Sequence, residues 1–274
     1  MHIVPAQKND IINITGGAKM SATGTIYDEL ADINSWVNFT PGEVQYARFS
    51  TNLIFTAMKI TDLYYSLCIA RANLHFLDNN DFGDYAKDEQ SIKFIKSMHI
   101  QNSLIFYNIA VDYSWQVLWL YYMTDLNTYP PTSKLYEKAI EGCNYEELML
   151  GLTLERDFKM RDNIVKPFFQ KNAAYSKIRP MYNYLKHRGT YHFDGLGLNR
   201  KEMMLKLVRN GQPVDLPVVY RKEMDIELTK SLLLQFDRDF VEYMFYLIDV
   251  LMPKDFTTRT IPFNEMLTAL INKY

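Results

Sequence analysis

Apolar residues recur at spacings of three and four over several long stretches of the chain, which is the period of an amphipathic helix. The three longest stretches span residues 43–77, 92–125 and 225–252. Turn-forming or helix-stopping residues follow each of them, at 78–83, at 127–131 and at Pro253. This pattern predicts three long helices that pack side by side in an antiparallel bundle.

Shorter helices are predicted between and beyond these three, at 27–37, from about 144, at 154–174, at 180–188 and at 262–272. One segment differs, because residues 203–220 alternate partly and carry Asn210-Gly211 near the middle, which favours a β-hairpin. Pro213 and Pro217 restrict its second strand to a sheet edge. The expected fold is mainly α, an antiparallel bundle of long helices with a small β-hairpin insertion.

The chain of 274 residues is long enough for one large domain. Residues 1–20 are polar and contain Gly16-Gly17, so we expect a flexible leader followed by a single helical domain over 21–274. No secretory signal is recognised at the N-terminus. Residues 104–123 have the length of a membrane span, but Asn108, Asp112 and Gln116 form a polar stripe that favours a bundle helix. We therefore expect a cytoplasmic protein with no membrane contact.

Two cysteines, Cys68 and Cys143, fit no metal or redox spacing and are expected to be reduced. His99, Asn102 and Asp112 form no metal-ligand pattern, and Glu-x-x-His pairs are absent from the sequence. We accordingly expect neither a metal nor a cofactor. Asp62, Asp112 and Asp249 are candidates to face the bundle interior, and satisfied structural polar groups are the favoured interpretation of them.

The net charge of −2 does not indicate a nucleic-acid-binding protein as a whole. However, residues 171–201 contain seven basic residues and one acidic residue, a net charge of +6 before histidine, so the rest of the chain carries −8. The segment also holds His187 and His192. Arginine, lysine, histidine, asparagine and tyrosine together supply what phosphate binding and proton transfer need. The alternative is a solvated helix end, since basic residues stabilise helix C-termini without any ligand.

The geometry predicted for this segment concentrates the candidates. Pro180 suits the first turn of a helix and Gly189 the position just past its end. Arg179, Asn183 and His187 then lie four residues apart on one face. Tyr182 and Tyr184 either stack on bases or pack in the bundle, and packing is favoured for each.

The stretch Tyr182-Asn183-Tyr184-Leu185-Lys186-His187, followed by Arg188-Gly189, resembles the motif of the HEPN superfamily (higher eukaryotes and prokaryotes nucleotide-binding). That motif is an arginine, a polar residue that is often asparagine, three further residues and a histidine. Asn183 and His187 match it, whereas Tyr182 stands in the place of the arginine. The resemblance covers this short motif, the two long helices before it and the one after it.

The resemblance implies a helical bundle that forms a homodimer and cleaves RNA without a metal, through attack by the ribose 2′-hydroxyl. His187 would move the proton and Asn183 would orient His187 or the phosphate. Arg179 or Arg188 would replace the missing arginine. A prokaryotic defence or toxin–antitoxin setting, with a partner protein, is also implied by the resemblance alone.

The candidate catalytic residues are therefore His187, Asn183, Arg188 and Arg179, and the candidate substrate-binding residues are Lys186, Tyr182, His192 and Lys177. Whether the protein is an enzyme stays open, because a lost phosphate-facing arginine removes a large electrostatic contribution to catalysis. The first alternative is a catalytically inactive HEPN-like module that binds nucleic acid, nucleotide or a protein partner. The second is a structural or assembly module whose basic segment is a solvated face.

Overall fold

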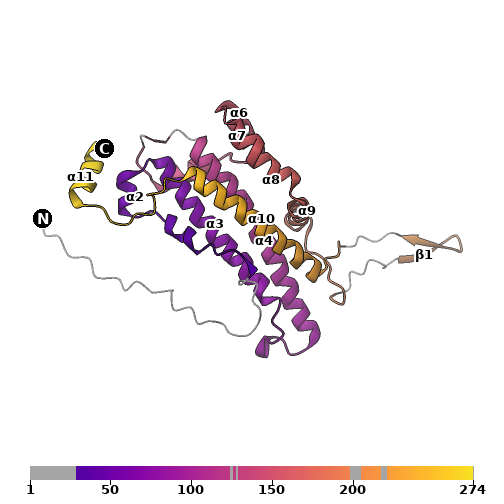
Figure 1. Ribbon diagram of the computed structural model, residues 1–274. Coiled ribbons are helices and arrows are strands. Elements are labelled where there is room, and N and C mark those ends of the chain that lie inside the picture. Colours follow the sequence, from indigo (N-terminus) through magenta and orange to yellow (C-terminus); the bar gives the residue numbers. More distant parts are fainter. Residues whose placement is uncertain (1–28, 124–125, 128, 198–204, 217–220, 274) are drawn as a thin grey trace.

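The computed structural model describes residues 29–123, 126–127, 129–197, 205–216 and 221–273, and Figure 1 shows them as a bundle of long helices. The expected fold class is confirmed, a mainly α bundle with one small β-hairpin. In chain order the helices are η1 (Asn34–Phe39), α2 (Glu43–Arg48), α3 (Thr51–Phe76), η2 (Gly83–Tyr85), α4 (Glu89–Tyr122), α5 (Ser133–Ile140), α6 (Tyr145–Leu154), α7 (Phe158–Met160), η3 (Arg161–Val165), α8 (Lys166–Lys171), α9 (Ala173–Arg188), α10 (Ile226–Leu251) and α11 (Phe263–Lys273).

Helices α3 and α4 form the centre of the bundle, and they lie side by side in Figure 1. Asp88 caps α4 by accepting a hydrogen bond from the backbone N–H of Ser91 at 2.9 Å. The predicted single helix over 43–77 is wrong in one respect, because it breaks at Phe49 and Ser50 into α2 and α3. Both residues adopt extended backbone angles there, although neither is a glycine or a proline.

Helix α10 packs against α4 and completes the core. Its side chains Phe236, Phe240 and Leu247 are fully buried, as the spacing of apolar residues predicts. Asp225 caps its first turn through the backbone N–H of Leu228, at 2.8 Å. The expected helix over 225–252 is therefore confirmed to within one residue at each end.

Among the described residues, α3 is the one helix long and apolar enough to cross a membrane, and 61% of its most apolar window is buried inside the protein. It carries Lys59 and Arg71, both buried and both paired with carboxylates. The suspected span over 104–123 belongs to α4, whose Leu104, Val111 and Leu118 are fully buried. Both helices thus pack as core helices of a bundle.

Several short helices differ from the predicted ones. The helix expected over 27–37 is not continuous within the described residues, because Glu29 is helical, residues 30–33 are not, and the 3₁₀-helix η1 follows. Helix α5 was not predicted. The helix expected over 154–174 is divided into α7, the π-helix η3 and α8, and Leu154 ends α6 instead. The leader predicted over 1–20 lies outside the described residues.

Helix α9 begins earlier than predicted, and Pro180 lies in its interior rather than in its first turn. The reason is Asn172, whose side chain accepts a hydrogen bond from the backbone N–H of Tyr175 at 2.7 Å and so caps the helix eight residues before the proline expected to begin it. The end of α9 is as predicted, since Gly189 follows it with φ +116°.

The predicted hairpin is confirmed as strands β1 (Leu205–Arg209) and β2 (Gln212–Leu216), which pair antiparallel with Arg209 opposite Gln212. The two turn residues, Asn210 and Gly211, have φ +54° and +75°, as a type I′ turn requires. Figure 1 shows the hairpin projecting away from the helices.

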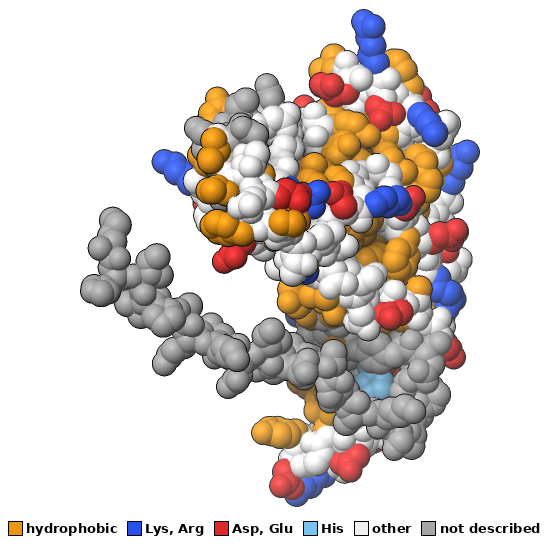
Figure 2. Space-filling model, turned by 60° about the vertical axis from the view of Figure 1, so that its left-hand side comes forward, with side chains coloured by type: hydrophobic (Ala, Val, Ile, Leu, Met, Phe, Trp, Pro, Cys, Tyr) orange, Lys and Arg blue, Asp and Glu red, His pale blue; other side chains and the backbone are white. Residues whose placement is uncertain are grey.

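The opposite end of the molecule is formed by α2 and the C-terminal helix α11, and Figure 2 views it from that side. Hydrophobic side chains reach the surface there among scattered charges. Phe263, Leu267 and Ile271 follow one another every four residues on α11 and are 45–69% exposed. In Figure 1, α2 and α11 lie at the left of the molecule and the hairpin lies at the right.

Candidate functional site

The last turn of α9 brings most of the predicted residues together at the surface. Lys186, His187 and Arg188 form that turn, and Asn183 lies one turn before His187. All four side chains are exposed. Basic side chains at the C-terminal end of a helix are favoured by the unpaired carbonyl groups there, and Lys186 also interacts weakly with the Asp112 carboxylate on α4.

His187 is exposed, and its side chain has no hydrogen-bond or ion-pair partner in the part of the chain that the structure describes. Arg188 is exposed beside it on the same turn. A histidine in this position is free to contact a ligand or a second protein surface. This matches the exposure that a proton-transferring group needs, but no general acid or base partner is provided by the described residues around it.

A groove of about 440 Å³ lies between α4 and α9. Its α9 side consists of Tyr182, Leu185 and Lys186, and Thr190 follows at the helix end. Its α4 side consists of Met98, Gln101, Asn102 and Ile105. We call this the α4–α9 groove. Asn102 and Lys186 are exposed polar side chains on its two sides, and Met98 is 48% exposed on its floor.

A second hollow of about 440 Å³ shares Met98, Gln101 and Thr190 with the α4–α9 groove and extends it. Its lining includes His192 and Arg221. Arg221 donates a hydrogen bond from Nη1 to Oγ1 of Thr190 at 2.9 Å, which ties this cation to the end of α9. The groove and the hollow that extends it are thus lined by one fixed cation each, Lys186 and Arg221.

Arg179 does not belong to this exposed cluster. Its Nη1 lies 3.0 Å from Oδ1 of Asp112 on α4, and its side chain is only 22% exposed. The guanidinium also lies over the rings of Trp115 and Tyr182, at 5.1 and 5.3 Å from their centroids. The arginine that was proposed to replace the missing motif arginine is therefore bound within the protein, where it joins α9 to α4.

The polar stripe predicted on α4 explains why the Arg179 side chain lies against that helix. Asn108 is fully buried and accepts a hydrogen bond from Nη1 of Arg179 at 3.4 Å. Burial raises the pKa of the Asp112 carboxyl, while the nearby Arg179 and, less strongly, Lys186 act in the opposite direction. Arg179 thus compensates a carboxylate that burial would otherwise penalise.

Tyr182 and Tyr184 both pack against the bundle, which is the arrangement that the sequence favours over stacking on bases. Tyr182 is half-buried under Arg179, and burial raises its pKa. The hydroxyl of Tyr184 accepts a hydrogen bond from the backbone N–H of Lys222 at 3.1 Å, and its ring packs on Tyr191 at 4.7 Å between centroids. Tyr182 still lines the α4–α9 groove, so one part of it remains available to a ligand.

The two remaining candidates are placed differently. His192 is 9% exposed and is held by its backbone, which donates to Lys222 at 2.8 Å and accepts from Met224 at 2.9 Å. It lines the second hollow. Lys177 is exposed on α9 but lies ten residues before His187, about 15 Å along the helix axis, so the structure does not bring it to the groove.

Sequence reasoning did not assign Gln101, Asn102, Arg221 and Lys222 to the site. Gln101 and Asn102 come from α4, more than 70 residues before α9 begins, and no local pattern connects the two helices. The adjacent basic pair Arg221-Lys222 was a usable signal, because it follows the predicted hairpin that leads back to the bundle.

Among the described residues, no group of three or more histidine, cysteine, aspartate or glutamate side chains is placed to hold a metal ion. The chain matches no protein-family model, and neither a curated protein nor a solved structure shows a significant similarity to it. The resemblance to the HEPN superfamily therefore stays a prediction.

Proposed function

We propose that the protein binds single-stranded RNA along the α4–α9 groove without cleaving it. One observation carries this proposal: Lys186, His187 and Arg188 are exposed on the last turn of α9, where Lys186 lines the groove, whereas Arg179 forms an ion pair with Asp112. Fixed positive charge for phosphates is present, but the arginine that catalysis would need is engaged elsewhere.

The groove has the two kinds of surface that a single strand requires. Lys186 lines the groove, Arg221 lines the hollow that extends it, and together they provide charge for successive phosphates. Tyr182, Met98 and Ile105 provide the apolar surface on which a base can lie, and Asn102 provides an amide that hydrogen-bonds base edges. A volume of about 440 Å³ accommodates an unpaired base, which favours single strands over a duplex.

The binding test uses a fluorescent single-stranded RNA oligonucleotide and measures anisotropy between 50 and 300 mM salt. We expect affinity to fall as salt rises, because each phosphate contact releases condensed counterions. Lys186→Gln and Arg188→Gln should each reduce the salt slope by about 0.7, as for one lost contact on a single strand. A nucleoside diphosphate tested alone shows whether one nucleotide suffices.

Lys177→Gln is the matched control, since Lys177 is an exposed lysine of the same helix that lies away from the groove. It should change affinity less than twofold. Absence of RNA binding at low salt, or an equal loss with Lys177→Gln, would contradict the proposal. The second result would indicate that the charge acts only as a solvated helix face.

A metal-independent ribonuclease is the second candidate, favoured by the unpartnered and exposed His187 with Arg188 beside it. On this proposal, two copies of the chain would bring both histidines to one cleft, as the HEPN resemblance implies. Incubation of unlabelled RNA with the protein and a chelator separates the two functions. Cleavage that persists with chelator and disappears in His187→Ala would show that the protein is a ribonuclease and not only an RNA-binding protein. On that proposal, a partner protein in a defence or toxin–antitoxin system would regulate the activity.

A further inference from the structure

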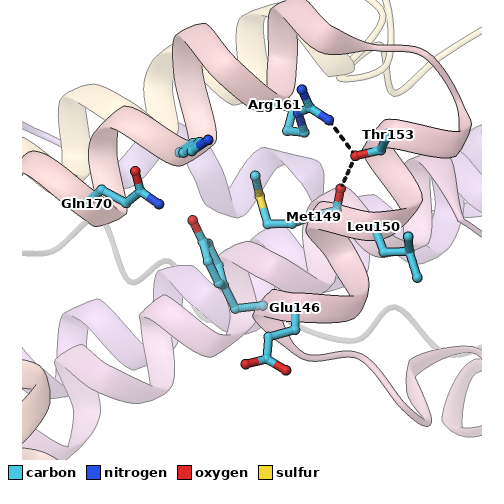
Figure 3. A pocket seen from close by; sticks show the side chains of 8 residues that line it. Glu146, Met149, Leu150, Thr153, Arg161 and Gln170 are labelled. Carbon is cyan, nitrogen blue, oxygen red and sulfur yellow. Dashed lines mark hydrogen bonds between the residues drawn. The ribbon is translucent and has the colours of Figure 1, made fainter.

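A separate pocket of about 460 Å³ lies between α6 and the segment formed by η3 and α8 (Figure 3). On the α6 side it is lined by Tyr145, Met149 and Leu150, and on the other side by Arg161, Lys166 and Gln170. It shares no residue with the α4–α9 groove. Its volume falls within the range of small-molecule sites, which extends from roughly 300 to 1,000 Å³.

The π-helix η3 explains why two cations lie on one wall. In an α-helix, residues five apart point about 140° away from each other. In η3 the backbone N–H of Lys166 donates to the carbonyl of Arg161, five residues earlier, so the wider turn brings both onto one face. Gln170 then follows Lys166 by one α-helical turn on that face. Single π-turns occur preferentially at functional sites, because they reposition side chains in this way.

The two cations differ in how their charge is used. Arg161 is held in place by Asp162, which accepts from Nε at 2.9 Å and from Nη2 at 2.6 Å, and its Nη1 donates to Thr153 at 2.6 Å. Figure 3 shows this arginine fixed against Thr153 at one end of the pocket. Lys166 is exposed and forms no ion pair with a described residue. Arg161 and Asp162 offset each other, and Lys166 acts on Asp162 only weakly, so one positive charge is left for a ligand.

The opposite wall has a polar group without a partner. The Tyr145 hydroxyl is buried and forms no hydrogen bond with the residues that the structure describes. A buried hydroxyl without a partner costs about 1–3 kcal/mol, which a bound acceptor would recover. Burial also raises the pKa of Tyr145, so the hydroxyl remains a donor at neutral pH.

The rest of the pocket is apolar, and exposed apolar side chains also lie beside its entrance. Met149 and Leu150 form its wall on α6, Leu150 is 54% exposed, and Leu154 on the next turn is 71% exposed. The one acidic lining residue, Glu146, is directed away from Arg161 in Figure 3. Two negative charges would exceed what Lys166 can neutralise, whereas one charge on an apolar body fits.

We propose that this pocket binds a small amphipathic organic anion, with its head group on Lys166, Gln170 and the Tyr145 hydroxyl and its apolar chain along Met149 and Leu150. The probes are octanoate and octyl sulfate, which each carry one negative charge, with octanol as the uncharged equivalent, and binding to the full-length protein is measured by titration calorimetry. We expect saturable binding of at least one anion and weaker binding of octanol. A preference between the two anions identifies the head group.

Two variants and one control test the named contacts. Lys166→Met should weaken anion binding about tenfold, as for one lost charge-assisted hydrogen bond, and should abolish the preference over octanol. Tyr145→Phe should weaken binding while leaving the melting temperature of the ligand-free protein unchanged or higher, because it removes an unpaired hydroxyl. Lys171→Met, at the exposed end of α8, should have no effect.

Circular dichroism confirms that each variant is folded before it is titrated. The proposal is overturned if neither anion binds saturably, or if anion and octanol bind equally well to the wild type and to Lys166→Met. It is also overturned if Lys171→Met weakens binding as much as Lys166→Met. Because no residue of the α4–α9 groove is altered, these outcomes are independent of whether the protein binds RNA.

Discussion

Arg71 on α3 and Asp237 on α10 form a two-point ion pair inside the bundle, with Nη2 to Oδ1 at 2.7 Å and Nε to Oδ2 at 2.9 Å. The side chains are 5% and 0% exposed. Tyr107 on α4 donates its hydroxyl to Asp237 at 2.7 Å, and Arg71 donates to the carbonyl of Ala31 at 3.0 Å. Three helices and the segment before η1 are thus joined through one buried ion pair.

Removal of one member of this group is expected to be severe. Asp237→Asn should lower the free energy of unfolding by about 3–5 kcal/mol, because it leaves a buried guanidinium without its counterion. Tyr107→Phe should cost less, about 1.5–3 kcal/mol, for one hydrogen bond to a charged group. Guanidinium chloride unfolding followed by circular dichroism measures both. The double variant Arg71→Met with Asp237→Leu is the control and should recover most of the loss, and equal instability of the double and single variants would contradict this account.

Arg179 is expected to act on stability and not on RNA affinity. Arg179→Gln removes the ion pair with Asp112 and the contacts with two rings, and should cost about 1–2 kcal/mol, since the pair is partly exposed to solvent. Lys186→Gln should show the reverse, with little change in stability and weaker RNA binding. Parallel unfolding and anisotropy measurements distinguish the two residues. A large loss of RNA affinity in the folded Arg179→Gln variant would contradict this prediction and show that Arg179 contributes to RNA binding.

The long helices were predictable because their spacing of apolar residues reports the buried face directly. The residues at which the helices begin were harder to predict. Pro180 suggested a helix start, yet the capping amide of Asn172 satisfies an earlier turn and the proline is tolerated inside α9. Similarly, Phe49 and Ser50 interrupt a continuous helical pattern, where Ser50 is the N-cap of α3 and the ring of Phe49 packs on Phe256 from the far end of the chain.

The candidate site was predictable only on its α9 side. The basic cluster around His187 is contiguous in sequence, whereas Asn102 reaches the groove from another helix. The burial of Asp237 was not predictable either, since Arg238 and Asp239 follow it in the sequence and the three together resemble a solvated face. Only the packing of α10 on α4 shows that it is buried. Likewise, the withdrawal of Arg179 depends on where Asp112 lies.

The hairpin is expected to form and unfold independently of the bundle. Gly211 has φ +75°, so Gly211→Val should strain the turn by about 1–2 kcal/mol and loosen β1 and β2. Hydrogen exchange of a peptide spanning 205–216 should accelerate, while the bundle keeps its unfolding midpoint. Asn210→Gly, which also tolerates positive φ, should leave exchange nearly unchanged. A lower midpoint for the whole protein with Gly211→Val would show that the hairpin supports the bundle.

The two thiols are expected to react slowly in the folded protein. Burial raises the pKa of Cys143 from 9.0 to about 12, with Asp112 adding to the rise and Lys59 opposing it. Burial also raises the pKa of Cys68, while Tyr64 and Arg71 act to lower it. Only the thiolate is nucleophilic, so alkylation of Cys143 at pH 8 should be roughly a thousandfold slower than in the unfolded chain.

Iodoacetamide labelling of the Cys68→Ser variant, with and without urea, measures Cys143 alone. In the folded state the rate should keep rising about tenfold per pH unit between pH 8 and 11, whereas in urea it should level off near pH 9. The raised pKa also means that the neutral thiol favours folding, so its contribution is complete below pH 9 and is lost as pH rises toward 12. A folded-state rate at pH 8 within tenfold of the rate in urea would place Cys143 in contact with solvent and contradict the burial that raises its pKa.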